Sequence, residues 1–424
     1  MKKADKKTIG KLNQLDKIMG GLSSKSSAPK KSKGATFKTG EVVLLLFITM
    51  IVSLIMGSLT TYKLLPISGV KLDSALSEFI DNYEYITKNY NGKINKGELI
   101  DAALDAMLNK LDRNSMYMND DESHNFNILL EGSYSGLGVQ IYDKDNKIIV
   151  YKVYENSPAD KAGLKVGDVI TAFDGKSTAN ATSTDLANKI KDIKDKAISI
   201  TYQRDGKENT VVLKKGTIKI DSVLSKTYEE NGKKIGYIAI GIFASNSSEQ
   251  FKEQLETLEK QNIDSLIIDL RSNSGGYLFA AENIISEFLS SKHVIYQIQK
   301  DDKVTKHYSK GKKDKKYKIY ILVNGESASA SEVMASALSE QYGATLIGEK
   351  TFGKGTVQEM QDLKNGDQYK LTTKNWLTSK GVWIEGTGVF PHIEIALDEK
   401  FYENPTEAND NQLQNALERA KKES

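Results

Sequence analysis

The chain has 424 residues, of which 39% are hydrophobic and 27% charged, which suits a globular protein of two or three domains. The absence of cysteine excludes disulfides, thiolate metal sites and a cysteine nucleophile, and the four histidines lack the spacing of a zinc site, so we expect no metal and no cofactor. Residues 1–40 hold 11 lysines and two aspartates and carry +9, whereas the remainder carries −6, so the folded part has no nucleic-acid signature.

An uncharged apolar segment, residues 42–62, follows a basic tail at residues 1–41 and is bounded by Glu41 and Lys63. As a helix it would be about 30 Å long, the thickness of a hydrocarbon core. The positive-inside rule then puts the N-terminus in the cytoplasm and everything after the segment outside. A cleaved signal peptide is the alternative. Because the charged region is long and no small-residue cleavage site follows, we expect an uncleaved single-pass anchor in the cell membrane.

Residues 70–130 have the apolar spacing of helices. Two sets of apolar residues recur at helical intervals, namely Leu72, Leu76, Phe79, Ile80 and Tyr83, and then Leu99, Ala102, Ala103, Ala106 and Met107. Asn91-Gly92 separates the two sets. We expect a small helical module, whose surface could pair two copies of the chain into a homodimer.

Short strands replace helices over residues 131–216. Ser157-Pro158-Ala159 begins a short helix among them, and the loop Ser135-Gly136-Leu137-Gly138 leads the first strand. This order resembles a PDZ domain. In such a domain the backbone amides of the loop, here those of Gly136, Leu137 and Gly138, hold a terminal carboxylate, and the adjacent strand edge pairs with an extended peptide. The alternative is a small β-fold whose glycines only turn the chain.

Residues 217–400 alternate apolar strands with amphipathic helices, which predicts an α/β core with a largely parallel sheet. The expected strands are 235–240, 265–270, 318–323 and 345–348, and the expected helices are 251–258, 280–289 and 332–338. Residues 401–424 are expected to form a C-terminal helical tail.

Three serines stand at the junction of a predicted strand and helix. Ser327, Ser329 and Ser331 lie two residues apart, so spacing alone does not choose between them. A hydroxyl at such a junction lies at the sheet edge, where a helix N-terminus favours developing negative charge. One of the serines could be a nucleophile, or all three could only cap the helix.

Lys354 follows Ser329 by 25 residues and lies between two glycines. A lysine serves as a general base only if burial or nearby positive charge lowers its pKa from about 10.4. On an extended chain Gln358 would face the same side and could orient the amine. The pattern suggests a serine activated by lysine without histidine. The alternative is a solvated lysine beside a surface amide.

A glycine pair, Gly275-Gly276, follows the most apolar predicted strand and the sequence Asp269-Leu270-Arg271. Backbone amides at such a turn can converge on an oxyanion. The alternative is an ordinary glycine-rich turn.

Five ordered motifs together resemble the carboxy-terminal processing proteases, tail-specific serine peptidases of family S41. They are Leu111-Asp112-x-x-Ser115-x-Tyr117, the PDZ segment, Asp269-Leu270-Arg271…Gly275-Gly276, Ser327 to Glu332, and Phe352-Gly353-Lys354-Gly355-Thr356-Val357-Gln358. The resemblance implies a crotonase/ClpP-like α/β protease core with an inserted PDZ domain. It makes Ser329 the nucleophile, Lys354 the general base and Gln358 the residue that holds the lysine. It also assigns the oxyanion hole to the backbone amides of Gly275 and Ala330.

The chain departs from the family pattern in three places. Ser274 replaces the proline before the glycine pair, Arg113-Asn114 replaces Pro-His, and Pro391-His392 replaces Pro-Asp. We expect the first change to loosen a turn and the other two to lie outside the catalytic set.

The sequence therefore predicts a membrane-anchored serine endopeptidase that cleaves exported proteins near accessible, apolar C-terminal tails received by the PDZ domain. A non-catalytic PDZ scaffold that binds such tails at the membrane is one alternative. A histidine-dependent serine hydrolase is another.

Overall fold

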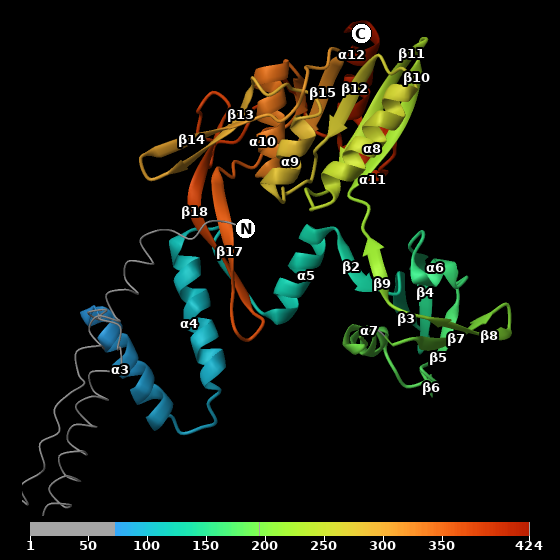
Figure 1. Ribbon diagram of the computed structural model, residues 1–424, viewed down its shortest axis with the longest axis vertical. Coiled ribbons are helices and arrows are strands. Elements are labelled where there is room, and N and C mark those ends of the chain that lie inside the picture. Colours follow the sequence, from blue (N-terminus) through green and yellow to red (C-terminus); the bar gives the residue numbers. More distant parts are fainter. Residues whose placement is uncertain (1–72, 195, 424) are drawn as a thin grey trace, which may run out of the picture. The chain divides into compact units, whose positions relative to one another are not determined.

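The computed structural model describes residues 73–194 and 196–423 (Figure 1). The basic tail and the apolar segment predicted at residues 1–41 and 42–62 lie outside the described residues. No helix in the described part of the chain is both long and apolar enough to cross a bilayer. The chain divides into two compact units, Met1–Ile94 and Asn95–Ser424.

In the first unit, residues Ser74–Asn89 form the helix α3. Asp73 caps the helix by accepting a hydrogen bond from the Ala75 amide. Four residues of the predicted apolar stripe lie on this helix, and Leu72 lies outside the described residues. No residue of the helix is buried, and Leu76 and Phe79 keep 46% and 47% of their surface exposed.

The second unit begins with two helices and a short strand. They are α4 (Lys96–Leu111), β1 (Met116–Met118) and α5 (Asp120–Glu131). A capping box between Asn119 and Glu122 starts α5, and Gly132, with φ of 63°, ends it. The helices predicted ahead of the PDZ segment are thus present.

A small β domain follows, and its two ends are paired with each other. Antiparallel pairing of β2 (Ser133–Gly136) with β9 (Gly216–Lys219) brings the ends together, so the domain is an insertion. Its sheet has the order β3-β4-β5-β7-β8, with β6 on β5. The elements are β3 (Val139–Lys144), β4 (Lys147–Val153), α6 (Pro158–Lys161), β5 (Val169–Phe173), β6 (Lys176–Ser177), α7 (Ser183–Asp192), β7 (Ile198–Arg204) and β8 (Lys207–Leu213).

A six-stranded sheet forms the centre of the second unit, in the order β10-β11-β12-β15-β16-β19. Its strands are β10 (Val223–Glu230), β11 (Lys233–Ile240), β12 (Ser265–Asp269), β15 (Lys318–Val323), β16 (Thr345–Gly348) and β19 (Ile393–Glu394). Every neighbouring pair is parallel except β10 with β11. The prediction of a largely parallel α/β sheet is confirmed.

Helices cover both faces of this sheet (Figure 1). One face carries α8 (Ser247–Lys260), α9 (Leu278–Ile285) and α10 (Ala330–Ala337). A short π-helical turn (Leu338–Tyr342) extends α10. After the last strand come α11 (Glu399–Glu403), a 3-10 turn (Glu407–Asn409) and α12 (Asn411–Glu423). On the opposite face Leu413 and Leu417 of α12 pack in one buried cluster with Tyr320. The segment expected as a helical tail therefore contributes to the core.

A second, antiparallel sheet has the order β1-β18-β13-β14, with β17 paired to β18. Its further strands are β13 (Val294–Lys300), β14 (Lys303–Tyr308), β17 (Thr356–Asp362) and β18 (Gln368–Thr378). Trp376 of β18 is fully buried in the same cluster as α10, so this sheet shares the main core. The sequence pattern does not predict these strands.

A buried ion-pair network anchors the end of β12. The Arg271 guanidinium contacts the carboxylates of Asp269 and Asp410 at 2.6 and 2.8 Å. Gln412 accepts a further hydrogen bond from Arg271, and the Tyr237 hydroxyl donates to Asp269 at 2.8 Å. Because every charge here is paired and hydrogen-bonded, the network offsets much of its desolvation and fixes the strand end from which the glycine loop leaves.

Candidate active site

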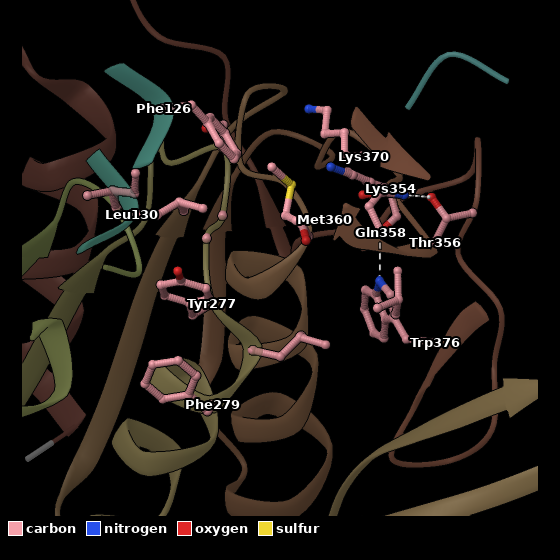
Figure 2. A pocket seen from close by; sticks show the side chains of 17 residues that line it. Phe126, Leu130, Tyr277, Phe279, Lys354, Thr356, Gln358, Met360, Lys370 and Trp376 are labelled. Atoms are coloured by element: carbon pink, nitrogen blue, oxygen red, sulfur yellow. Dashed lines mark hydrogen bonds between the residues drawn. The ribbon is translucent and has the colours of Figure 1, made fainter. Parts of the chain in front are cut away.

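A pocket of about 510 Å³ lies where the loops after β12 and β15 meet the β17–β18 hairpin (Figure 2). Active sites of open α/β sheets lie at such carboxyl ends of strands. Four of the predicted site residues line the pocket, namely Gly275, Ser329, Lys354 and Gln358. Apolar and aromatic side chains supply much of the remaining wall, among them Phe126, Leu130, Tyr277, Phe279, Met360 and Trp376.

The structure distinguishes the three serines of the junction. Ser327 and Ser331 are fully buried, and each hydroxyl donates to a backbone carbonyl at 2.8 Å, those of Leu270 and Asn273. Ser329 is half-buried and lines the pocket. Of the three serines, Ser329 is therefore the one placed to reach a ligand.

Ser329 has an unusual backbone conformation, with φ of 54° and ψ of −115°. Residues other than glycine avoid positive φ, so the surroundings must hold this serine in place. Its amide donates to Glu332 Oε2 at 2.8 Å. Gly275 packs against it so closely that a Cβ on Gly275 would lie 2.8 Å from the Cβ of Ser329. A strained serine at a strand-to-helix turn is typical of a nucleophile that presents its hydroxyl to substrate.

The loop that carries Lys354 is fixed through its backbone. The Lys354 amide donates to Glu332 Oε2 at 2.9 Å, and its carbonyl accepts from the Trp376 indole at 2.7 Å. The neighbouring Gly355 amide donates to Glu385 at 2.7 Å. These bonds fix the backbone of Lys354 and Gly355, and none of them involves the Lys354 side chain.

Glu332 joins the serine junction to the lysine loop. Its carboxylate is fully buried and accepts four hydrogen bonds. Three come from the backbone amides of Ser329, Gly353 and Lys354, and the fourth from the Thr351 hydroxyl at 2.5 Å. Because the amides of Ser329 and Lys354 donate to the same oxygen, the backbones of these two residues are neighbours.

The Lys354 amine has a pKa of about 8, lowered from its ordinary value of 10.5. Burial in the apolar pocket is the largest cause, and the positive charge of Lys370 adds to it. The carboxylates of Glu385 and Glu332 act in the opposite direction but do not prevail. A substantial fraction of the amine is therefore neutral near pH 8, as a general base requires.

The structure brings Ser329 and Lys354 to one pocket without joining their side chains. Among the described residues no hydrogen bond links Ser329 Oγ to Lys354 Nζ. A rotation of the long lysine side chain is the movement that the fixed backbones leave open.

Gln358 points to different partners from those predicted. Its amide nitrogen donates to the hydroxyls of Thr356 and Thr372, at 2.9 and 3.1 Å, rather than binding Lys354. A bulge between Val357 and Gln358 breaks the strict alternation on which the expectation relied. Both Gln358 and Lys354 nevertheless lie at the same end of the pocket (Figure 2).

The two residues predicted to form the oxyanion hole are adjacent. The Ala330 nitrogen lies 3.2 Å from the position that a Cβ on Gly275 would occupy. In this structure, however, the Gly275 amide donates to Asn273 Oδ1 at 2.9 Å. This amide becomes available to an oxyanion only when it parts from Asn273.

The predicted carboxylate loop of the inserted domain has two amides without a protein acceptor. Within the described residues the Leu137 and Gly138 amides donate to no protein group, whereas their carbonyls accept from the amides of Ala159 and Tyr154 at 2.9 and 3.0 Å. Gly136, by contrast, lies in β2 and pairs with Gly216. Since β3 is an edge strand, the loop and the strand edge together suit a peptide terminus.

None of the four histidines lines the pocket. His293 contacts Asp314 and Gln341, and His307 stacks on Tyr296. His392 accepts a hydrogen bond from a backbone amide, and His124 lies on α5. The histidine-dependent alternative therefore has no base at this site.

The replaced pair Arg113-Asn114, expected to lie outside the catalytic set, contacts the lysine loop. Arg113 donates to the Gly353 carbonyl at 2.9 Å, and its guanidinium lies 4.7 Å from the ring centre of Phe352. The Asn114 amide donates to Thr356 at 2.9 Å. The departure from the family pattern was the available signal.

Comparisons with known proteins agree with this architecture. The model of peptidase family S41 matches residues 234–395, and the model of a PDZ domain matches residues 135–214. The carboxy-terminal processing protease CtpB of Bacillus subtilis (strain 168) is 34% identical over 337 residues, which cover 78% of this chain and 70% of that protein. CtpA of the same organism is 32% identical, covering 83% of this chain and 77% of that protein. A probable CtpA-like serine protease of Staphylococcus haemolyticus is 33% identical, with 88% and 75% covered.

The mixed α/β fold, the inserted PDZ domain and these similarities define a serine peptidase. Since relatives above 30% identity align along most of both chains, the chain belongs to peptidase family S41, as a carboxy-terminal processing serine peptidase.

Replacing Glu332 by Gln should lower kcat by roughly 100-fold with a much smaller change in KM. One carboxylate oxygen becomes an NH₂ group that faces other hydrogen-bond donors, so the backbones of Ser329 and Lys354 are no longer held together. Steady-state kinetics on a peptide substrate measures both constants, and circular dichroism checks the fold. Glu326→Gln, at an exposed position of the same segment, is the control. Unchanged kcat in Glu332→Gln would contradict the positioning role.

The activity should rise with pH through about 8, because protonated Lys354 cannot accept a proton and its pKa is about 8. We expect kcat/KM to rise about tenfold per pH unit below this value and to level off above it. Lys354→Arg, which has no neutral form in this range, should be inactive throughout. A flat profile in an enzyme that stays folded would count against lysine as the base.

Proposed function

We propose that this protein is a membrane-anchored serine endopeptidase in which Ser329 is the nucleophile and Lys354 the general base. The supporting observation is the pocket that both residues line, in which Ser329 is strained and exposed to ligand and the pKa of Lys354 is lowered to about 8. Glu332 keeps the two backbones together, and in our proposal a rotation of the Lys354 side chain brings its amine to the hydroxyl.

In the proposed reaction, Ser329 Oγ attacks the carbonyl carbon of the scissile peptide bond while its proton passes to neutral Lys354 Nζ. The carbonyl oxygen becomes an oxyanion, which accepts hydrogen bonds from the Ala330 amide and from the Gly275 amide released by Asn273. The C–N bond then breaks and the Lys354 ammonium protonates the leaving amine. Water hydrolyses the acyl-enzyme, with Lys354 taking the proton of the water and returning it to Ser329.

Substrate binding would complete this site. Gln358 now binds Thr356 and Thr372, and the Gly275 amide now binds Asn273. Each of these contacts is a single, exchangeable hydrogen bond, so a peptide that lies along the glycine loop can replace them. Gln358 then takes the role of holding the lysine amine.

The PDZ domain would receive the C-terminal tail of the substrate. The Leu137 and Gly138 amides would bind the terminal carboxylate, and the tail would pair with the open edge of β3. Cleavage would then fall near the C-terminus of exported proteins, and the apolar part of the pocket wall favours an apolar residue at one position near the scissile bond.

The anchor would be residues 42–62, with the basic tail in the cytoplasm and the catalytic unit outside. The supporting feature is the uncharged apolar stretch between Glu41 and Lys63.

The full chain should remain with membranes after an alkaline carbonate wash, because a spanning helix resists extraction that releases peripheral proteins. Deletion of residues 42–62 should move the protein to the soluble fraction, which immunoblotting of both fractions measures. Release of the full chain by the wash, or recovery of a mature form that begins after residue 62, would contradict the uncleaved anchor.

Ser329→Ala should abolish cleavage of an unstructured protein substrate, because no other serine of the junction reaches the pocket. Gel electrophoresis and mass spectrometry of the fragments measure this loss. Ser274→Ala is the matched control, since Ser274 is exposed and lines the same pocket. Variants of each histidine should keep their activity. A non-catalytic scaffold would produce no fragments even with the unaltered chain, and cleavage by Ser329→Ala would exclude the proposed nucleophile.

A further inference from the structure

The catalytic pocket is positively charged and contains no acid. Its wall includes the amines of Lys354 and Lys370, and none of its 17 lining residues is an aspartate or glutamate. Both lysines project into the same end of the pocket, beside Gln358 and Met360 (Figure 2). If Lys354 is the base, it acts in its neutral form. Lys370 then helps to lower the pKa of Lys354, but in the proposed reaction it contacts no group of the substrate.

Lys370 lies on β18, opposite Met360 of β17 and Met116 of β1. Its side chain is half-buried, and burial lowers the pKa of its amine. The amine lies 5.3 Å from the ring centre of Phe126, a cation–π contact. Within the described part of the chain no carboxylate pairs with it, so its charge has lost water without gaining a counter-ion.

Lys374, four residues further along the same strand, shows the contrast. It forms an ion pair with Glu359 at 2.5 Å and does not line the pocket. In the β17–β18 hairpin, Lys374 therefore has a carboxylate partner, whereas Lys370, which lines the pocket, has none within the described residues. An anion that enters with the substrate would complete the environment of Lys370, and the apolar surroundings would strengthen the attraction.

We propose that Lys370 binds a carboxylate of the peptide substrate close to the scissile bond, and so makes the catalytic pocket selective for acidic peptides. The carboxylate can be an Asp or Glu side chain or the terminal carboxylate of a short tail, which share one chemistry. This proposal rests on the proposed peptidase function and adds a second point of substrate selection to the tail-binding loop of the PDZ domain. Lys354 is not the binding group, because a carboxylate on it would keep its amine protonated.

Two pairs of fluorogenic peptides test the proposal on the full-length enzyme. The first pair differs only by Glu or Gln at a position next to the scissile bond, and the second only by a free or amidated C-terminus. The ratio of kcat/KM within a pair is compared between enzyme variants, so that any effect of Lys370 on the Lys354 base, which is common to both peptides, cancels.

In the unaltered enzyme we expect the carboxylate peptide of at least one pair to be preferred by roughly tenfold, the size of one charged hydrogen bond. Lys370→Gln should bring the ratio of the Glu and Gln peptides near one, or lower the ratio of the free and amidated peptides to the preference that the PDZ loop alone gives. Lys370→Glu should lower the responding ratio further, and Lys370→Arg should keep it. Lys374→Gln should also keep it, because Lys374 already has Glu359 as its partner. The pair that responds identifies the source of the carboxylate.

Ratios that stay unchanged in Lys370→Gln overturn the proposal, as does an equal slowing of both peptides, which would assign Lys370 to the lysine base or to the fold alone. A preference that also disappears in Lys370→Arg overturns it too, because the charge is then not the cause. Failure of the unaltered enzyme to cleave any of the peptides or an unstructured protein would instead remove the proposed function, and this proposal with it.

Discussion

The buried carboxylate of Glu332 is the contact on which the rest of the site depends. Each of its four hydrogen bonds involves a charged acceptor, the kind that contributes about 1.5–3 kcal/mol. Ser329 keeps a backbone conformation that serine rarely adopts. The loop that carries Lys354 comes from a different part of the chain and donates to the same carboxylate. One side chain therefore sets the strained junction and the lysine loop at the same time, through their backbones.

This arrangement creates an electrostatic conflict that burial resolves. A carboxylate near an amine normally keeps it protonated, and both Glu332 and Glu385 have this effect on Lys354. Their oxygens, however, already accept backbone amides, and the lysine side chain extends into a pocket walled by Trp376 and other apolar groups. Desolvation and the nearby Lys370 then lower the pKa further than the acids raise it. Acids hold the backbone in place while the amine remains able to accept a proton.

The parts of the fold that the sequence predicted are those with strong local patterns. Every residue of β12 is buried and its centre, Leu266 to Ile268, is apolar, and the PDZ segment carries its glycine and proline signals at fixed places. The second sheet was missed because strands such as Thr356–Asp362 and Lys303–Tyr308 are polar and largely exposed. The Asn365-Gly366 turn between β17 and β18 was a usable hairpin signal. Spacing alone left the three serines open, and the family resemblance selected Ser329. The structural reasons are that the other two hydroxyls are buried against carbonyls and that a bulge sets the contacts of Gln358. Both are tertiary facts that spacing does not contain.

The ribbon of β2 and β9 has a consequence for how such proteins diversify. Its four facing pairs of residues end in Gly136 opposite Gly216, where no side chains cross from one strand to the other. The chain enters and leaves the inserted domain at the same place. If a genetic event removes or exchanges the domain, the two remaining chain ends are therefore already close enough for a tight turn to join them. Evolution can therefore exchange the inserted PDZ domain without altering the protease core.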